Sequence, residues 1–176
     1  MKKVLSIVLA AVMLLCLTSC FSSGGNDGVQ TIRSSGSTLT MEFPKTWKTQ
    51  KLNDEASIEM ALASKEQYLV VLEESREHFA EGFTLNGYIT LVKESMEPAV
   101  EGAQSTAIRD VQVGTLNAKQ FDISGSVSGI KVTYLVTCFE ANNIFYQVVA
   151  WSLQSKYTEA KAAFNTILGS VAFASS

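Results

Sequence analysis

Two segments of this chain are apolar on both sides of a β-strand, and they restrict the fold more than any other feature. In residues 68–72 and 144–151, apolar side chains occupy nearly all odd and even positions alike. A strand with one solvated face alternates apolar and polar residues, so a run without alternation indicates burial on both faces. We therefore expect these two strands in the centre of a sheet that other elements cover on both sides.

The other expected strands are joined by short turns. Residues 57–64 and 68–74 are separated by Lys65-Glu66-Gln67, which predicts a hairpin. A parallel pair needs a long crossover connection, so strands joined by short turns are antiparallel. The sequence thus predicts a largely antiparallel sheet with strands at 38–43, 57–64, 68–74, 105–113, 117–127, 129–139, 143–152 and 171–173.

Two segments have the apolar spacing of amphipathic helices. The first has this spacing at Leu85, Tyr88, Ile89, Val92 and Met96. We expect Thr84 to cap this helix, and Pro98 with Gly102 to end it. The second, at 157–168, is expected to be capped by Ser155 and ended by Gly169 in a left-handed conformation. Helices packed on an antiparallel sheet make an α+β fold.

Residues 1–19 have the three parts of a secretory signal. Two lysines precede a mostly apolar run at 4–17, and the small residues Thr18 and Ser19 follow it. The alternative is a retained helical anchor, but the run is shorter than the roughly 20 residues that a membrane-spanning helix needs. The segment is therefore interpreted as a cleaved signal peptide.

Leu17-Thr18-Ser19-Cys20 resembles the lipobox of bacterial lipoprotein signal peptides. The resemblance implies cleavage before Cys20, attachment of diacylglycerol to its sulfur and modification by fatty acids such as palmitate. It also implies an anchor on the extracytoplasmic face of the cell membrane. The other alternative is cleavage without a lipid, which would leave a cysteine at the new terminus without a role.

The mature chain has the size of one domain. Cleavage after residue 19 of the 176 residues leaves 157, and at that length a core needs no disulfide or metal. Residues 20–37 are rich in Ser, Gly and Asn, so we interpret them as a flexible tether before a folded domain at 38–176. We expect this domain to be monomeric and to need no cofactor.

The charge of the mature chain restricts its partners. Its 12 basic and 17 acidic residues give a formal charge of −5. A modest negative charge favours solubility. It argues against a nucleic-acid partner and against a polybasic membrane patch.

Few residues of the expected domain could carry catalysis. Cys138 shares a strand face with Val132, Tyr134 and Val136, so we interpret it as a buried, unreactive thiol. His78 is the single histidine, among charged residues between a strand and a helix. A solvated loop explains it better than a metal site, which would need further histidines or a defined carboxylate spacing. We predict no catalytic residue, no metal site and no enzyme activity.

The aromatic residues Trp47, Tyr146 and Trp151 are the candidates for binding a partner. Aromatic side chains often anchor interfaces. Most of those in this chain alternate with aliphatic residues, however, which favours a role in the core. Only two helices are expected to cover two sheet faces, so we also expect a groove where the sheet stays uncovered.

The order of elements carries a family resemblance. Phe43-Pro44-Lys45-Thr46-Trp47 is similar to the Phe-Pro-x-x-Trp motif at the entry of PsbP-like domains. The later course is similar too, with a helix around 88–96, the aromatic strand 144–151 and a final helix that ends at 164–170. The resemblance covers residues 38–173. It implies a three-layer α/β/α sandwich around an antiparallel sheet, with binding or assembly roles rather than catalysis.

These observations lead to one functional hypothesis and one alternative. The hypothesis is a lipid-anchored, extracytoplasmic, non-enzymatic domain that binds a protein or another envelope component. The alternative is a carrier of small apolar solutes with a cavity beside the sheet. A small molecule that co-purifies with the domain would favour the carrier.

Overall fold

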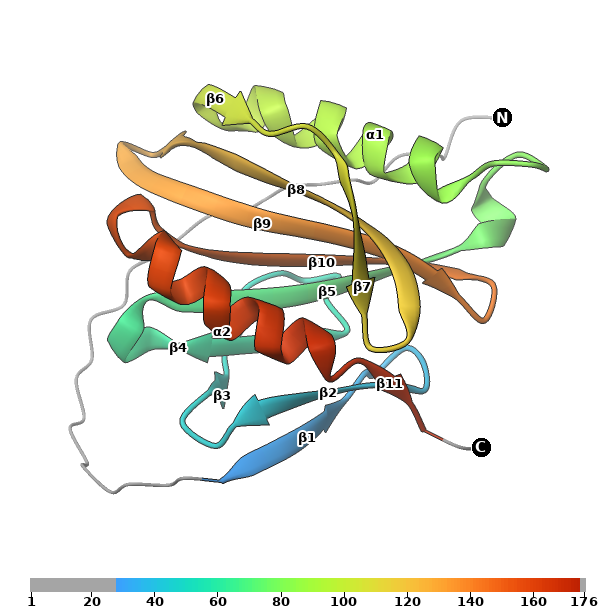
Figure 1. The fold of residues 1–176 in the computed structure, drawn as a ribbon, viewed down its shortest axis with the longest axis horizontal. Helices are drawn as coiled ribbons and strands as arrows, with labels where there is room; N and C mark the ends of the chain where they lie inside the picture. Colours follow the sequence, from blue (N-terminus) through green and yellow to red (C-terminus); the bar gives the residue numbers. More distant parts are fainter. Residues whose placement is uncertain (1–27, 175–176) are drawn as a thin grey trace.

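The computed structural model describes residues 28–174 (Figure 1). The expected signal peptide and the expected lipid attachment at Cys20 lie outside the described residues. Within those residues, no helix is both long and apolar enough to cross a bilayer.

The centre of the molecule is an eight-stranded sheet in which every strand pair is antiparallel. Its order is β3-β4-β5-β10-β9-β8-β6, and β7 also pairs with β8. The two doubly apolar segments form β5 and β10, which lie in the middle of the sheet as predicted, and the structure pairs them with each other. The strands are β3 (Lys48–Thr49), β4 (Ile58–Leu62), β5 (Gln67–Ser75), β6 (Glu101–Ser105), β7 (Arg109–Val113), β8 (Leu116–Val127), β9 (Ile130–Ala141) and β10 (Ile144–Leu153).

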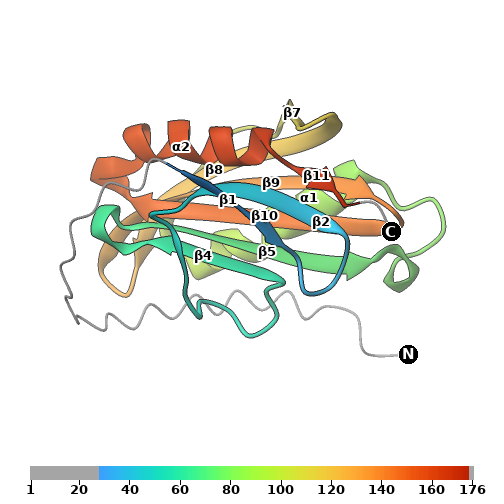
Figure 2. The same ribbon diagram turned by 90° about the horizontal axis from the view of Figure 1, so that it is seen from below.

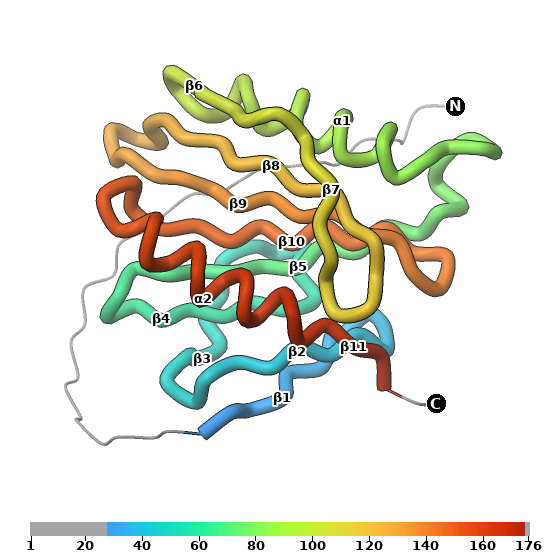
Figure 3. Tube along the Cα trace, viewed as in Figure 1, coloured from blue at the N-terminus to red at the C-terminus, as the bar shows by residue number. Residues whose placement is uncertain are grey.

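Other elements cover both faces of this sheet, which makes three layers (Figures 1 and 3). Helix α1 (Leu85–Met96) packs on one face, mainly over β8 and β9. Helix α2 (Tyr157–Gly169) packs on the opposite face. A small sheet shares the layer of α2 and was not predicted; it consists of β1 (Val29–Arg33), β2 (Leu39–Pro44) and β11 (Ala172–Phe173).

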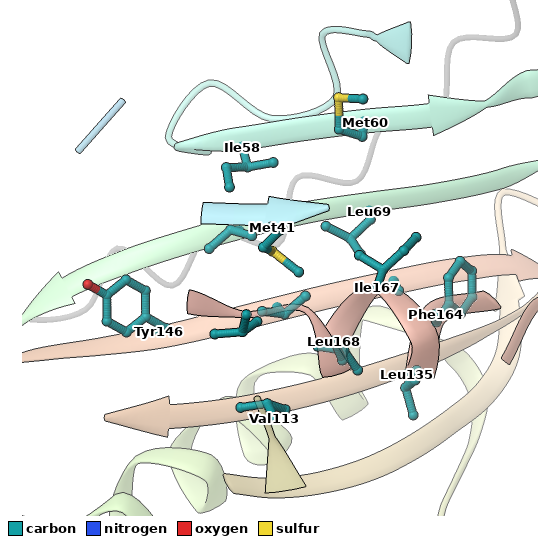
Figure 4. Packing of buried hydrophobic residues seen from close by; sticks show 14 of the residues in the cluster. Met41, Ile58, Met60, Leu69, Val113, Leu135, Tyr146, Phe164, Ile167 and Leu168 are labelled. Carbon is teal, nitrogen blue, oxygen red and sulfur yellow. The ribbon is translucent and has the colours of Figure 1, made fainter. Parts of the chain in front are cut away.

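The two faces of the large sheet carry separate hydrophobic cores. Under α2, the side chains of Phe164, Ile167 and Leu168 lie against residues of the large sheet such as Leu69 and Leu135 (Figure 4). Under α1, the core is built around Tyr88 and other residues of the helix and strands. Successive side chains of a strand point to opposite faces, so each long strand contributes alternate residues to the two cores.

Strand β1 corrects the predicted domain boundary. Residues 29–33 belong to the segment that we interpreted as a flexible tether, yet they pair with β2 in register from Val29–Pro44 to Arg33–Thr40. Ile32 packs against the core under α2, which explains why this short strand is ordered. The folded unit therefore begins nine residues before Thr38.

The helix ends match the predictions only in part. The side chain of Thr84 accepts a hydrogen bond from the Gly87 backbone N–H at 3.2 Å, so its role as the cap of α1 is confirmed. Ser155 does not cap α2, because it lies inside a short 3-10 helix, Gln154–Lys156, that precedes it. Gly169 is the last residue of α2 and not a left-handed stop; Ser170 follows it, and its hydroxyl donates to the Ile167 carbonyl at 2.6 Å.

The segment predicted as one strand at 105–113 is divided in two. Strand β6 ends at Ser105 and β7 begins at Arg109, and both pair with the long strand β8. Short 3-10 helices follow β4 (Ala63–Lys65), β5 (Arg76–His78) and α1 (Glu97–Ala99). The division places β6 beside one half of β8 and β7 beside the other.

Cys138 is fully buried, on the strand face shared with Val136, as predicted. Burial raises the pKa of its thiol, so the reactive thiolate is rare at neutral pH.

We predict that this thiol reacts with an aromatic disulfide reagent far more slowly in the folded chain than in denaturant. Mass spectrometry of the peptide that contains Cys138 measures the reaction without interference from other cysteines. Rapid, complete labelling of the folded chain would show that the strand faces are assigned wrongly.

Candidate functional site

The three aromatic binding candidates are core residues that the structure does not bring together. Trp47, Tyr146 and Trp151 expose 1%, 0% and 5% of their surfaces. Trp47 and Tyr146 belong to the core under α2, whereas Trp151 belongs to the core under α1. A partner could reach these side chains only if a core opened. Their burial therefore agrees with a role in core packing and not with a role in binding.

Each of these aromatic residues packs against other rings. The ring centre of Trp47 lies 5.6 Å from that of Phe43 and 6.3 Å from that of Phe164, so it joins β2 to α2. Trp151 stacks on Tyr68 with ring centres 5.4 Å apart. The Phe-Pro-x-x-Trp motif therefore has a structural role, because it fixes the small sheet against helix α2.

The expected groove is present, but its lining is polar instead of aromatic. Its lining residues come from β6, β8, β9 and the 3-10 helix before α2, and Ser124 and Ser126 lie on the same face of β8 as Asp122, which contacts α2. Its volume is about 250 Å³. We call it the polar groove; its lining residues are Glu101, Gly102, Gln104, Ser124, Gly125, Ser126, Lys131 and Gln154.

Strand register sets the order of groups on the groove floor. Ser126 of β8 pairs with Glu101 of β6 on one side and with Lys131 of β9 on the other. Neighbouring strands lie about 4.8 Å apart, so a carboxylate and an ammonium group flank one hydroxyl. In the next row, the hydroxyl oxygens of Ser124 and Thr133 are 2.8 Å apart and hydrogen-bonded.

Two glycines allow β6 to pair closely with β8 beside the groove. A Cβ atom on Gly125 would lie 2.7 Å from the Glu101 carbonyl oxygen and 2.5 Å from a Val100 methyl group. Gly102 has a φ of +64° and lies where the pairing of β6 with β8 shifts register. Val100 belongs to the core under α1, so the glycine at 125 permits β6 to approach β8 closely on the face opposite to the groove.

A charged network lies farther along β8, where this strand meets α2. Asp122, two residues before Ser124 on the same face of β8, is 7% exposed. Its carboxylate oxygens lie 2.7 Å from Arg109 Nη1 and 2.7 Å from Lys161 Nζ, and the Tyr157 hydroxyl donates to it as well. We call these four residues the Asp122 network.

The network shifts the pKa values of two of its members. Burial acts to raise the pKa of Asp122, but hydrogen bonds from Lys161, Tyr157 and Arg109 outweigh it, so the pKa is lowered. Burial raises the pKa of Tyr157, and its hydrogen bond to Asp122 raises it further. Asp122 is therefore ionised and Tyr157 is neutral at physiological pH.

Further polar side chains extend this network beneath α2. Arg109 donates to Gln120 Oε1 at 2.6 Å, and Gln120 Nε2 donates to Thr137 Oγ1 at 2.8 Å. The polar row on β8 was missed in the sequence, although Gln120 and Asp122 alternate with Phe121 and Ile123. Such alternation is equally typical of an ordinary solvated strand face, so the pattern alone does not indicate a groove.

We predict that Asp122 contributes stability that is lost in acid. Its folded-state pKa is below the usual value of 3.8, so its contribution is present above pH 3.8 and disappears as pH falls through the folded-state pKa. Urea unfolding of the native chain and of Asp122→Asn at a series of pH values measures this, and the difference in unfolding free energy should shrink below that pH. The exposed Asp110, paired with Lys119, provides the control Asp110→Asn, for which the difference should stay small throughout. A difference for Asp122→Asn that grows in acid would contradict the assignment.

The arrangement can bind by hydrogen bonds and ion pairs. The groove offers both signs of charge together with carboxamide and hydroxyl groups, which can donate and accept. Within residues 28–174 there is no group of three or more histidine, cysteine or acidic side chains placed to hold a metal ion. His78 is exposed in the 3-10 helix after β5.

Comparisons with known proteins locate the fold. No family model matches the sequence, and no curated protein matches it. Among solved structures, cyanobacterial PsbP (CyanoP) from Synechocystis sp. PCC 6803 matches with a TM-score of 0.63 and 12% identity, over 90% of this chain and 99% of that chain. LpqN of Mycobacterium tuberculosis, described as involved in cell envelope biogenesis, matches with a TM-score of 0.59 and 13% identity, over 84% and 91%.

A eukaryotic protein has the same architecture. The Ran-binding protein Mog1p of Saccharomyces cerevisiae matches with a TM-score of 0.52 and 9% identity, over 80% of this chain and 85% of that chain. Identities this low establish similarity of fold and nothing more specific. The chain has the mixed α+β fold of PsbP-like proteins and Mog1, with two helices and a large antiparallel sheet.

Proposed function

We propose that this chain is a lipid-anchored, extracytoplasmic binding domain that holds a hydrophilic protein or envelope component in the polar groove. The lipid on Cys20 keeps the domain at the membrane. The groove supplies recognition, and no chemical step is required of it.

The observation that carries this proposal is the polar lining of an open groove on a rigid sheet. Its floor consists of β8 and β9, two strands of 12 residues each that pair from Ala118–Phe139 to Val127–Ile130. Glu101, Gln104, Lys131 and Gln154 project exposed polar side chains around it. Exposed groups on a fixed frame can bind a partner without a large loss of backbone entropy.

Two similar structures support a role in binding or assembly. LpqN is described as involved in cell envelope biogenesis, and Mog1p as Ran-binding. A lipobox would place this chain in the envelope too. The proposal applies that setting and that kind of role to the groove of this chain.

The alternative, a carrier of apolar solutes, requires a cavity lined by apolar side chains. The polar groove does not have such a lining, and the large residues of both cores pack closely against one another. Native mass spectrometry of the purified protein distinguishes the two functions. A bound apolar molecule would favour the carrier.

Site-specific photo-crosslinking tests the proposal in bacterial membranes. A photoreactive amino acid replaces Gln104 or Gln154 in the full-length chain, because both side chains are exposed at the groove. The controls are Asp54 and Thr166, which are exposed elsewhere. We expect an adduct of one discrete mass from the groove positions, and a loss of this adduct when Lys131→Glu is added. Identical adducts from all four positions, or none from the groove, would contradict the proposal.

A further inference from the structure

Most lysines and arginines of the described residues form ion pairs, and the few that do not are concentrated in one region. Residues 28–174 contain 12 lysines and arginines, and eight of them form ion pairs with acidic side chains. For the remaining four, no ion pair occurs within the described part of the chain: Arg33, Lys45, Lys48 and Lys131. Arg33 lies in β1, Lys45 follows β2, and Lys48 lies in β3 at the edge of the large sheet. Lys131 lies apart, in the polar groove.

The three cations are exposed around strand β1. The Lys45 backbone N–H donates to the Gly28 carbonyl at 2.8 Å, and Lys48 Nζ donates to the Lys45 carbonyl at 2.9 Å, so both lysines lie at the start of β1. Arg33 ends the same strand. We call Arg33, Lys45 and Lys48 the basic face; Figure 2 views the molecule from the side on which β1 and β2 lie.

The local charge has the opposite sign to that of the rest of the chain. Residues 21–50 contain these three cations and two acidic residues, Asp27 and Glu42, for a net charge of +1. Residues 51–176 contain 9 basic and 15 acidic residues, for a net charge of −6. An anionic surface therefore attracts the three cations beside β1 and repels most of the acidic remainder of the chain. From that remainder, Glu73 lies beside this segment, where its carboxylate accepts hydrogen bonds from Ser34 and Ser37.

The length of the chain places the same side near the lipid. Nine peptide links join Cys20 to Val29, the first residue of β1, so their extended length is at most about 32 Å. If Cys20 carries the lipid, the start of β1 stays within this distance of it, which keeps the charges beside β1 near the headgroups.

We propose that the basic face lies against anionic lipid headgroups when the domain is anchored, and that the polar groove faces away from the bilayer. The inference rests on the lipid anchor of the proposed function. The groove lies at β6 and β8, whereas the small sheet lies at the opposite edge of the large sheet, next to β3 and β4 (Figures 1 and 2). Three cations are fewer than a polybasic anchor contains, but here the lipid supplies the attachment and the cations set the orientation.

Fluorescence quenching on vesicles tests this orientation with the mature, lipidated chain. A fluorophore is attached to Thr46→Cys, beside the basic face, or to Gln154→Cys, at the groove; Cys138 is buried and stays unlabelled. The vesicles contain phosphatidylcholine with or without phosphatidylglycerol, and a lipid with a quencher on its headgroup. Flotation of the same samples measures attachment independently of orientation.

We expect strong quenching at position 46 and weak quenching at position 154 on phosphatidylglycerol vesicles. Each surface cation favours the bound orientation by roughly fivefold. Lys45→Glu with Lys48→Glu should therefore bring the two signals close to equality, whereas Lys131→Glu should leave them unchanged. Flotation with equal quenching at both positions in the native chain would overturn the orientation and leave the anchor intact. A failure to float on phosphatidylcholine vesicles would overturn the anchor, and the orientation with it.

Discussion

Phe164→Ala is expected to lower the free energy of unfolding by about 3–5 kcal/mol, which is a large share of the stability of a domain this size. Phe164 is fully buried on α2 and lies against Trp47, so its removal leaves a cavity between the helix, the small sheet and the large sheet. Chemical denaturation followed by circular dichroism measures the loss.

The control for this prediction is the next residue of the same helix. Asn165 is exposed, so Asn165→Ala should change the free energy of unfolding by less than about 0.5 kcal/mol. Equal stabilities for the two variants would mean that α2 does not seal this core. The three-layer architecture would then be wrong on that face.

Cys20→Ser is expected to abolish lipid attachment and signal cleavage, because the sulfur carries the lipid in the class of signal that residues 17–20 resemble. Labelling of growing bacteria with a radioactive fatty acid should mark the native chain and leave the variant unmarked. Cys16→Ser is the matched control, since Cys16 lacks small residues before it, and this variant should be labelled normally. Label that persists in Cys20→Ser would rule out this anchor.

The sequence predicted the centre of the fold because burial on both faces of a strand determines which positions are apolar. Residues 68–72 and 144–151 are apolar at nearly every position, and only strands covered on both faces require that pattern. Cys138 was placed correctly for the same reason, since its face of β9 is uniformly apolar. Strand pairing followed from the short turns, which exclude parallel connections.

Strand β1 was missed because its sequence has almost none of the apolar alternation that indicates a strand. Its five residues include one aliphatic side chain that faces a core, Ile32, and they lie within a Ser/Gly-rich segment. The pairing with β2 and the packing of Ile32 stabilise the strand, and both depend on distant parts of the chain. Local composition cannot report such contacts.

The sequence predicted that the sheet would have an uncovered region, but it did not predict where that region lies. Two helices cannot cover two faces of a large sheet, so an uncovered region was expected. Its position depends on how α2 crosses the strands and on the register shift between β6 and β8, which are tertiary features. The aromatic residues were weaker guides, because Trp47, Tyr146 and Trp151 stabilise the cores.

The most direct test of the account is to fill the groove. Ser126→Trp places a large side chain on its floor, and Thr166→Trp places the same side chain on an exposed position of α2. The measurement is the affinity of each membrane-anchored variant for the partner that crosslinks to position 104. We predict at least about tenfold weaker binding for Ser126→Trp, as for the loss of a central contact, and native affinity for Thr166→Trp. Native affinity in both variants, with both chains folded by circular dichroism, would contradict the claim that this groove is the binding site.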